Sequence, residues 1–63
     1  MYFVVNLKCG YVDFLDNVIS IDMNDLHEIT FKTNGVCWNS YNINDIVFFR
    51  QITENEYYHF TKH

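Results

Sequence analysis

Cysteines, histidines, serines and carboxylates are the side chains of this sequence that could do chemistry. A cysteine thiolate beside an imidazole can act as a nucleophile, and cysteines with histidines can hold zinc. The candidates are Cys9 and Cys37 with His27 and His59, but no pair has the Cys-x-x-Cys or His-x-x-x-His spacing that prearranges a metal site. We therefore expect no metal, and we expect both cysteines to act as small apolar side chains in or near strands.

The serines and carboxylates offer no better catalytic arrangement. Ser20 and Ser40 lack the neighbouring glycines of a nucleophile elbow. Acid–base catalysis needs one carboxyl of a pair to be buried and kept neutral, whereas the paired carboxylates here flank predicted turns, where water solvates them. These pairs are Asp13 with Asp16 and Asp22 with Asp25. The sequence thus predicts a protein that is not an enzyme and uses no cofactor.

The length of 63 residues allows one domain, residues 1–63. A chain this short buries only about 60% of the surface that it exposes when unfolded, so it usually needs a disulfide, a metal or a partner chain. A disulfide between Cys9 and Cys37 is one alternative, but nothing else indicates a secreted scaffold, and two reduced thiols are favoured. With no signal peptide and no run of about 18 apolar residues, we expect a cytoplasmic protein without a membrane partner.

Aromatic residues are unusually frequent, with six Phe, five Tyr and one Trp. Each can bury about 150–250 Å², which is more than so small a core can enclose. Either some rings cap the core edge-on, or they face a partner, and we expect a homodimer or larger assembly. The predicted aromatic anchors of a partner-binding surface are Trp38, Tyr41, Phe49, Tyr57 and Tyr58.

Charge is distributed unevenly around a formal net charge of −4. No Lys or Arg lies between Cys9 and Phe31, a segment that carries Asp13, Asp16, Asp22, Asp25 and Glu28. This balance disfavours direct nucleic-acid binding, which needs a basic face. The block is either an ordinary solvated face or an acidic face that binds a basic surface of another protein. The sharpest hypothesis is an inhibitor that occludes the nucleic-acid channel of a host enzyme, such as a defence nuclease.

Periodicity and turn signals predict five short strands. Glu28–Thr33 alternates cleanly between apolar and polar residues, and Asn34-Gly35 is a strong hairpin signal. A helix over Asp13–Ile19 is the rival reading of part of the second strand. The predicted strands are Tyr2–Lys8, Val12–Met23 (best from Asn17 onward), Glu28–Thr33, the return through Val36-Cys37-Trp38, and Ile46–Ile52.

The C-terminal segment matches a capping box, Thr53 with Glu56, which favours a short helix from about Glu54 to Thr61 over a further strand. Upstream, Ile46-Val47-Phe48-Phe49 is apolar on both faces, whereas a strand with one wet face should alternate. Either Tyr57, Tyr58 and Phe60 cover the second face, or another protein does.

Together these elements predict a mostly β fold: a small five-stranded antiparallel meander or SH3-like barrel with a possible short C-terminal helix. The segments that suggest a family are Lys8-Cys9-Gly10, Asn17–Ile21, Glu28–Phe31, Asn34-Gly35 and Tyr41–Ile46. Their order resembles short SH3-like or Sm-like β proteins of phages and mobile elements of low-GC bacteria. The resemblance spans roughly Val4 to Ile52 and implies a compact β fold in a phage context, hence a host cytoplasm, with no catalytic residues.

Two further functions compete with an inhibitor. A small barrel can bind single-stranded nucleic acid by stacking bases on exposed aromatics. Its residues here would be Trp38, Tyr41, Tyr57 and Tyr58 with Lys32, Arg50 and Lys62. The other alternative is a self-assembling structural subunit, which the aromatic surplus also fits.

Overall fold

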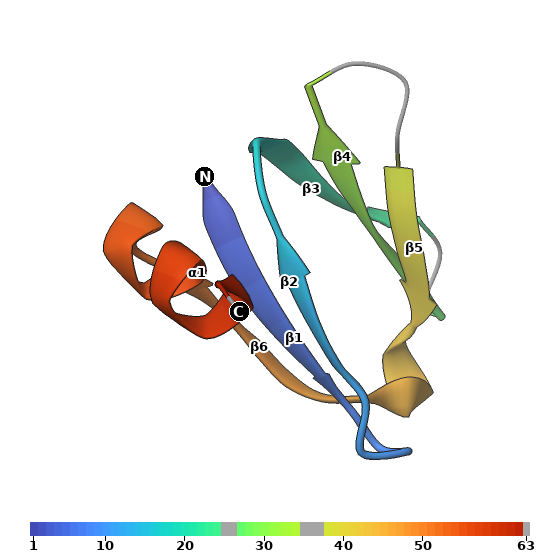
Figure 1. The fold of residues 1–63 in the computed structure, drawn as a ribbon. Coiled ribbons are helices and arrows are strands. Elements are labelled where there is room, and N and C mark those ends of the chain that lie inside the picture. The colour runs from blue at the N-terminus through green and yellow to red at the C-terminus, as the bar shows by residue number, and fades with distance from the viewer. Residues whose placement is uncertain (25–26, 35–37, 63) are drawn as a thin grey trace.

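The computed structural model describes residues 1–24, 27–34 and 38–62 (Figure 1). Within these ranges the chain forms six strands, a 3-10 helix and an α-helix. In chain order they are β1 (Tyr2–Leu7), β2 (Val12–Leu15), β3 (Val18–Asn24), β4 (Glu28–Thr33), β5 (Trp38–Asn42), η1 (Ile43–Asp45), β6 (Ile46–Ile52) and α1 (Glu54–Thr61).

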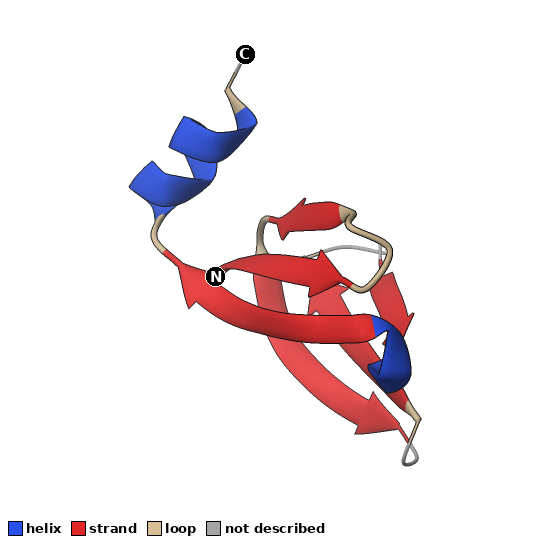
Figure 2. Ribbon diagram, turned by 90° about the horizontal axis from the view of Figure 1, so that it is seen from below, coloured by secondary structure: helices blue, strands red, loops and turns tan. Residues whose placement is uncertain are grey.

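The strands form two antiparallel sheets that enclose the core between them (Figure 2). The first sheet has the order β2-β1-β6, and the second sheet has the order β3-β4-β5. Both sheets contribute apolar side chains to one cluster, because alternate residues of a strand point to the same face. This cluster contains Phe3, Val5 and Leu15 from the first sheet and Val18, Ile29 and Phe31 from the second.

The strand predicted from Asn17 onward is confirmed as β3, but its extension back to Val12 as one continuous strand is wrong, and so is the rival helix over Asp13–Ile19. The segment forms two strands, β2 and β3, which makes six strands rather than five. Asn17 separates them with a φ of 56°, a left-handed conformation that asparagine tolerates better than most residues. The chain therefore leaves the first sheet after β2 and enters the second sheet as β3.

The predicted closed barrel is also wrong, because the sheets remain two separate three-stranded units. The 3-10 helix η1 joins β5 to β6 and is held by both sheets. The Ile43 amide donates to the His27 carbonyl at 2.8 Å, and the Lys8 amide donates to the Asp45 carbonyl at 2.8 Å. This connection delivers β6 to β1 rather than to β5, so the ring of strands does not close.

Other elements agree with the sequence. The strands predicted at Tyr2–Lys8, Glu28–Thr33 and Ile46–Ile52 are confirmed, the first ending at Leu7. The alternation in β4 buries Ile29 and Phe31. Gly35, Val36 and Cys37 of the predicted hairpin and return strand lie outside the described residues, but β4 and β5 do pair antiparallel up to Lys32 opposite Trp38.

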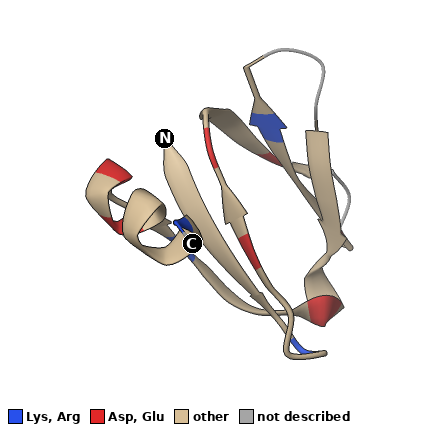
Figure 3. Ribbon diagram, viewed as in Figure 1, with Lys and Arg blue, Asp and Glu red and all other residues tan. Residues whose placement is uncertain are grey.

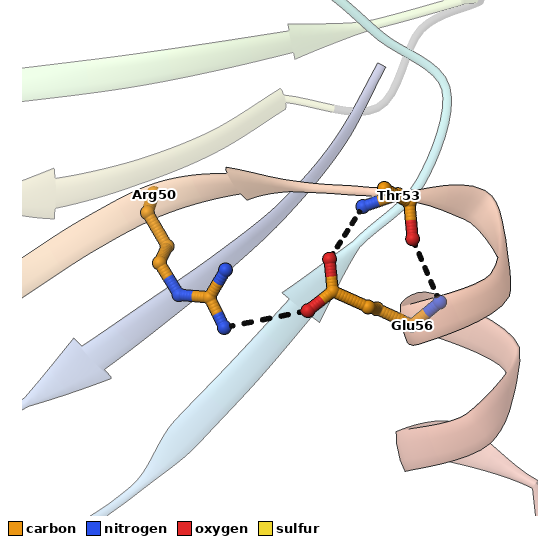
Figure 4. Close-up of polar contacts among 3 residues, drawn as sticks. All are labelled: Arg50, Thr53 and Glu56. Atoms are coloured by element: carbon orange, nitrogen blue, oxygen red, sulfur yellow. Dashed lines mark hydrogen bonds and ion pairs between the residues drawn. The ribbon is translucent and has the colours of Figure 1, made fainter.

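A C-terminal helix is confirmed over a strand, since α1 runs from Glu54 to Thr61 behind a complete capping box (Figure 4). The Glu56 amide donates to Thr53 Oγ1, and the Thr53 amide donates to Glu56 Oε1, each at 3.1 Å. The Arg50 guanidinium adds an ion pair to Glu56 at 3.7 Å. The backbone hydrogen bond from Thr53 is the main reason that the pKa of Glu56 lies below its ordinary value.

Candidate protein-binding site

The acidic residues predicted to form one face lie on several elements (Figure 3). Asp22, on β3, forms an ion pair of 2.7 Å with Lys32. Glu28 is exposed at the start of β4, and Asp16 is exposed after β2, where its charge helps to raise the pKa of Tyr57. Asp13 points toward Tyr41, and Asp25 lies outside the described residues. The described acids are therefore distributed over both sheets.

Asp13 has a structural partner between the sheets. The Tyr41 hydroxyl donates to Asp13 Oδ2 at 2.7 Å, which joins β5 of the second sheet to β2 of the first. Burial raises the pKa of Tyr41 well above its ordinary value, and the hydrogen bond to the Asp13 carboxylate raises it further. Both residues thus help to hold the two sheets together.

The aromatic residues predicted as anchors also separate into different regions. Trp38 is 65% exposed at the start of β5. Phe49 lies between the sheets, with its ring centroid 5.3 Å from that of Phe31. Tyr57 and Tyr58 belong to α1 and pack on Tyr2, with centroid distances of 5.0 and 6.3 Å. Burial is the first cause that raises the pKa values of Tyr2 and Tyr57.

Polar side chains on the outer face of the second sheet, the face turned away from the first sheet, bind one another. Besides its ion pair with Asp22, the Lys32 ammonium lies 5.4 Å from the centre of the Trp38 ring. The hydroxyls of Thr30 and Ser40 share a hydrogen bond of 2.9 Å across β4 and β5. This face therefore satisfies much of its own polarity.

A hollow whose described lining residues are all apolar lies at the start of β6, beside η1 and the adjoining ends of β3 and β4. We call it the β6 groove. Its volume is about 360 Å³, and its lining consists of Met23, Ile29, Ile43, Ile46, Val47, Phe48 and Phe49. Of these, Met23 is 65% exposed, Val47 61% and Phe48 49%. The groove is thus an open apolar surface that the chain only partly covers.

The aromatic residues of helix α1 pack elsewhere than on Val47 and Phe48, the exposed apolar residues at the start of β6. Its tyrosines contact Tyr2 on β1, and the Phe60 ring stacks on Phe14 of β2 with centroids 5.7 Å apart. Val47 and Phe48 stay exposed. The sequence predicted that either the C-terminal segment or another protein covers the apolar run 46–49. The C-terminal segment leaves Val47 and Phe48 uncovered.

Sequence reasoning identified the apolar run 46–49, including Phe49, but missed Met23 and Ile43 as members of the same site. The signal that it had was the unbroken apolar run 46–49. It could not find the other members because β3 and η1 meet β6 only through the tertiary fold. It also could not find the bulge at Val47, where the pairing shifts from Asn6 opposite Phe48 to Leu7 opposite Ile46.

The residues considered for catalysis and metal binding include two cysteines. Cys9 is an exposed free thiol, and Cys37 lies outside the described residues. Among the described side chains, no three from His, Cys, Asp and Glu are grouped closely enough to hold a metal ion. In the same part of the chain, no helix is long and apolar enough to cross a membrane.

The chain matches no protein-family model, no curated protein and no solved structure.

Proposed function

We propose that the protein is a non-enzymatic module that binds another protein through the β6 groove. The observation that carries this proposal is the grouping of Met23, Val47 and Phe48, each about half exposed or more, around one apolar hollow. Exposed apolar residues are common singly, but a contiguous apolar patch is typical of an interaction site.

Covering this patch contributes to the driving force for association. Full burial of a Val, Met or Phe side chain stabilises by about 1.5–3 kcal/mol, and the three residues are between 49% and 65% exposed. Phe49 lines the groove at 38% exposure and packs on Phe31 with ring centroids 5.3 Å apart, so it offers an aromatic surface supported by the core. Well-packed aromatics of this kind are frequent among the residues that dominate binding energy.

The positions of the cations support a protein partner over single-stranded nucleic acid. Lys32 is ion-paired with Asp22, and Arg50 lies 3.7 Å from Glu56, so both have acidic neighbours that compete with phosphate. Trp38 lies on the second sheet, whereas Tyr57 and Tyr58 lie on α1. If the proposal holds, single-stranded DNA or RNA at micromolar concentration leaves the tryptophan fluorescence unchanged.

Affinity capture with a matched pair of variants tests the proposal. Val47→Lys places a charge in the groove, and Ile19→Lys places the same charge at an exposed aliphatic residue of similar exposure, 63% against 61%. We expect the wild type and Ile19→Lys to retain the same protein from a host lysate that also contains an untagged copy of this chain, and Val47→Lys to lose it. Retention by all three chains would refute a groove-mediated contact.

The same complex also tests the narrower proposal of a phage-encoded inhibitor of a host nucleic-acid enzyme, which draws on the net charge of −4. Attraction between an acidic protein and a basic channel weakens as salt screens it. Apolar contact in the groove is largely insensitive to moderate salt. We therefore expect a charge-driven inhibitor complex to dissociate on raising the salt concentration and a groove-driven complex to persist.

A further inference from the structure

We propose that the partner of the β6 groove is a second copy of this chain, whose β6 pairs antiparallel with β6 around a twofold axis at Phe49. This inference rests on the proposed function, because it uses the same groove. It adds the free backbone edge of β6, its register and the identity of the partner.

Backbone hydrogen bonds around β1 show which groups of β6 are free to pair. The Leu7 amide donates toward β2, to Tyr11, and the Lys8 amide donates toward the β6 side, to Asp45. Successive residues of a strand present their amide and carbonyl groups to opposite edges. The even-numbered residues of β1 therefore face β6, where their partners include Phe48, Arg50 and Ile52. The backbone groups of Phe49 and Gln51 consequently point to the open edge.

Four strands form the edges of the two sheets, and β6 is the least protected of them. Native edges are usually short, charged, bulged or polar, because an exposed apolar edge recruits another strand. Strand β2 has four residues, β3 has a bulge at Ile19 and carries Asp22, and β5 is a five-residue polar strand. Strand β6 also has a bulge, at Val47, and one charge, at Arg50, but its seven residues include the longest unbroken apolar run of the four edges, residues 46–49. At β3, by contrast, Val18 already exchanges backbone hydrogen bonds with Met1.

Strand length and charge determine the register. Phe49 is the middle residue of Ile46–Ile52, so an axis there overlaps the whole strand and places Val47 opposite Gln51 of the second copy. Phe48 then lies beside Arg50 of the second copy, where a guanidinium can rest on an aromatic ring. An axis at Arg50 would set two like charges directly opposite, which is destabilising.

Pairing in this register also closes the β6 groove. The added strand lies along the edge that borders the hollow, and it brings Phe49 of the second copy against Phe49 and the side chain of Gln51 against Val47. One contact therefore satisfies the free backbone groups of β6 and covers the exposed apolar side chains. This combination is the general mode of strand addition, in which main-chain hydrogen bonds and side-chain pockets act together.

Sedimentation equilibrium over about a hundredfold range of chain concentration tests the proposal, since mass action governs a reversible dimer. We expect the wild type and Ile19→Lys to reach twice the 7.6 kDa of one chain. Val47→Lys and Gln51→Pro should remain monomeric. Proline at position 51 removes an outward amide without touching the hydrogen bonds to β1. Circular dichroism of each variant verifies that it is folded.

The outcomes separate this inference from the proposed function. A monomeric wild type at every concentration overturns the dimer, and capture of another protein that depends on Val47 would still uphold the groove as a protein-binding site. A dimer that both Val47→Lys and Gln51→Pro leave intact overturns the β6 interface. Loss of the dimer in these two variants, with Ile19→Lys unchanged, supports both.

Disulfide trapping tests the register separately. In a background of Cys9→Ser and Cys37→Ser, cysteines at positions 48 and 50 should lie directly opposite across the axis, with Cα atoms about 4.5 Å apart. We expect rapid formation of a covalent dimer on mild oxidation. The single variant Phe48→Cys offsets the two thiols by two residues and should cross-link slowly. Equal rates in the two variants would overturn the register centred on Phe49.

Discussion

The outer face of the second sheet and the β6 groove differ in whether their side chains already have interaction partners within the chain. On the second sheet, Lys32 engages both Asp22 and Trp38, and Thr30 bonds Ser40. At the groove, Val47 and Phe48 are exposed and every lining residue is apolar. A surface that satisfies its own polar groups gains little from a partner, whereas an apolar hollow gains by being covered. The comparison therefore locates binding on β6.

Both regions depend on a shared core, and breaking it should give the largest effect. Phe31 is fully buried and its ring meets those of Phe3, Tyr41 and Phe49. We expect Phe31→Ala to lower the free energy of unfolding by about 3–5 kcal/mol, because it leaves a cavity between the sheets. Chemical denaturation followed by circular dichroism measures the loss. A cost below about 1 kcal/mol would show that the sheets do not share this core.

The Tyr41–Asp13 bond joins the sheets from the edge of the core, and its loss should cost less. Tyr41→Phe removes one hydrogen bond to a carboxylate, which is worth about 1.5–3 kcal/mol. The pKa of Tyr41 is raised, so its contribution is complete below the ordinary tyrosine value and is lost as the pH rises above it. The difference in stability between wild type and Tyr41→Phe should thus shrink in alkali. A difference that stays constant up to high pH would contradict this linkage.

The helix cap should have a smaller and local effect. Thr53→Ala removes the oxygen that accepts from the Glu56 amide and should cost about 1 kcal/mol. The pKa of Glu56 is lowered, so the stability that its carboxylate contributes is present above its ordinary value and is lost as the pH falls through the folded-state value. Glu56→Gln should accordingly flatten the acid limb of the stability profile. The same acid sensitivity in both chains would argue against the capping box as its cause.

The ion pair on the second sheet should matter least. Lys32 and Asp22 are 37% and 43% exposed, and solvent screens pairs of this kind. We expect Asp22→Asn to change the free energy of unfolding by less than about 0.5 kcal/mol and to leave the oligomeric state unchanged. Thermal denaturation and sedimentation together measure both quantities. A large effect on either would mean that the polar face, too, takes part in binding.

Local signals were sufficient for much of this fold. The capping box needs only residues 53–56, and the alternation in β4 reports its buried face directly, so both were predicted from sequence. The break at Asn17 was missed because its evidence is a single backbone angle, which asparagine allows but does not require.

The site was less accessible to sequence reasoning than the fold. Acidic residues that are close in sequence, such as Asp13 and Asp22, separate because the chain crosses from one sheet to the other between them. Conversely, Met23, Ile43 and Val47 become neighbours only after both sheets form. The apolar run 46–49 indicated an interface, but its other members required the tertiary structure.

The pairing of β1 with β6 has a consequence for the nascent chain. The second sheet is built from consecutive strands, so its contacts are local and can form early. Strand β6 has to meet β1, which lies far earlier in the sequence, a closure that comes late because the loop between them is long. Strand β6 is also synthesised after β1 and β2, when the β1–β2 hairpin is already available to receive it. This order shortens the time during which an unpaired apolar strand is open to aggregation during synthesis.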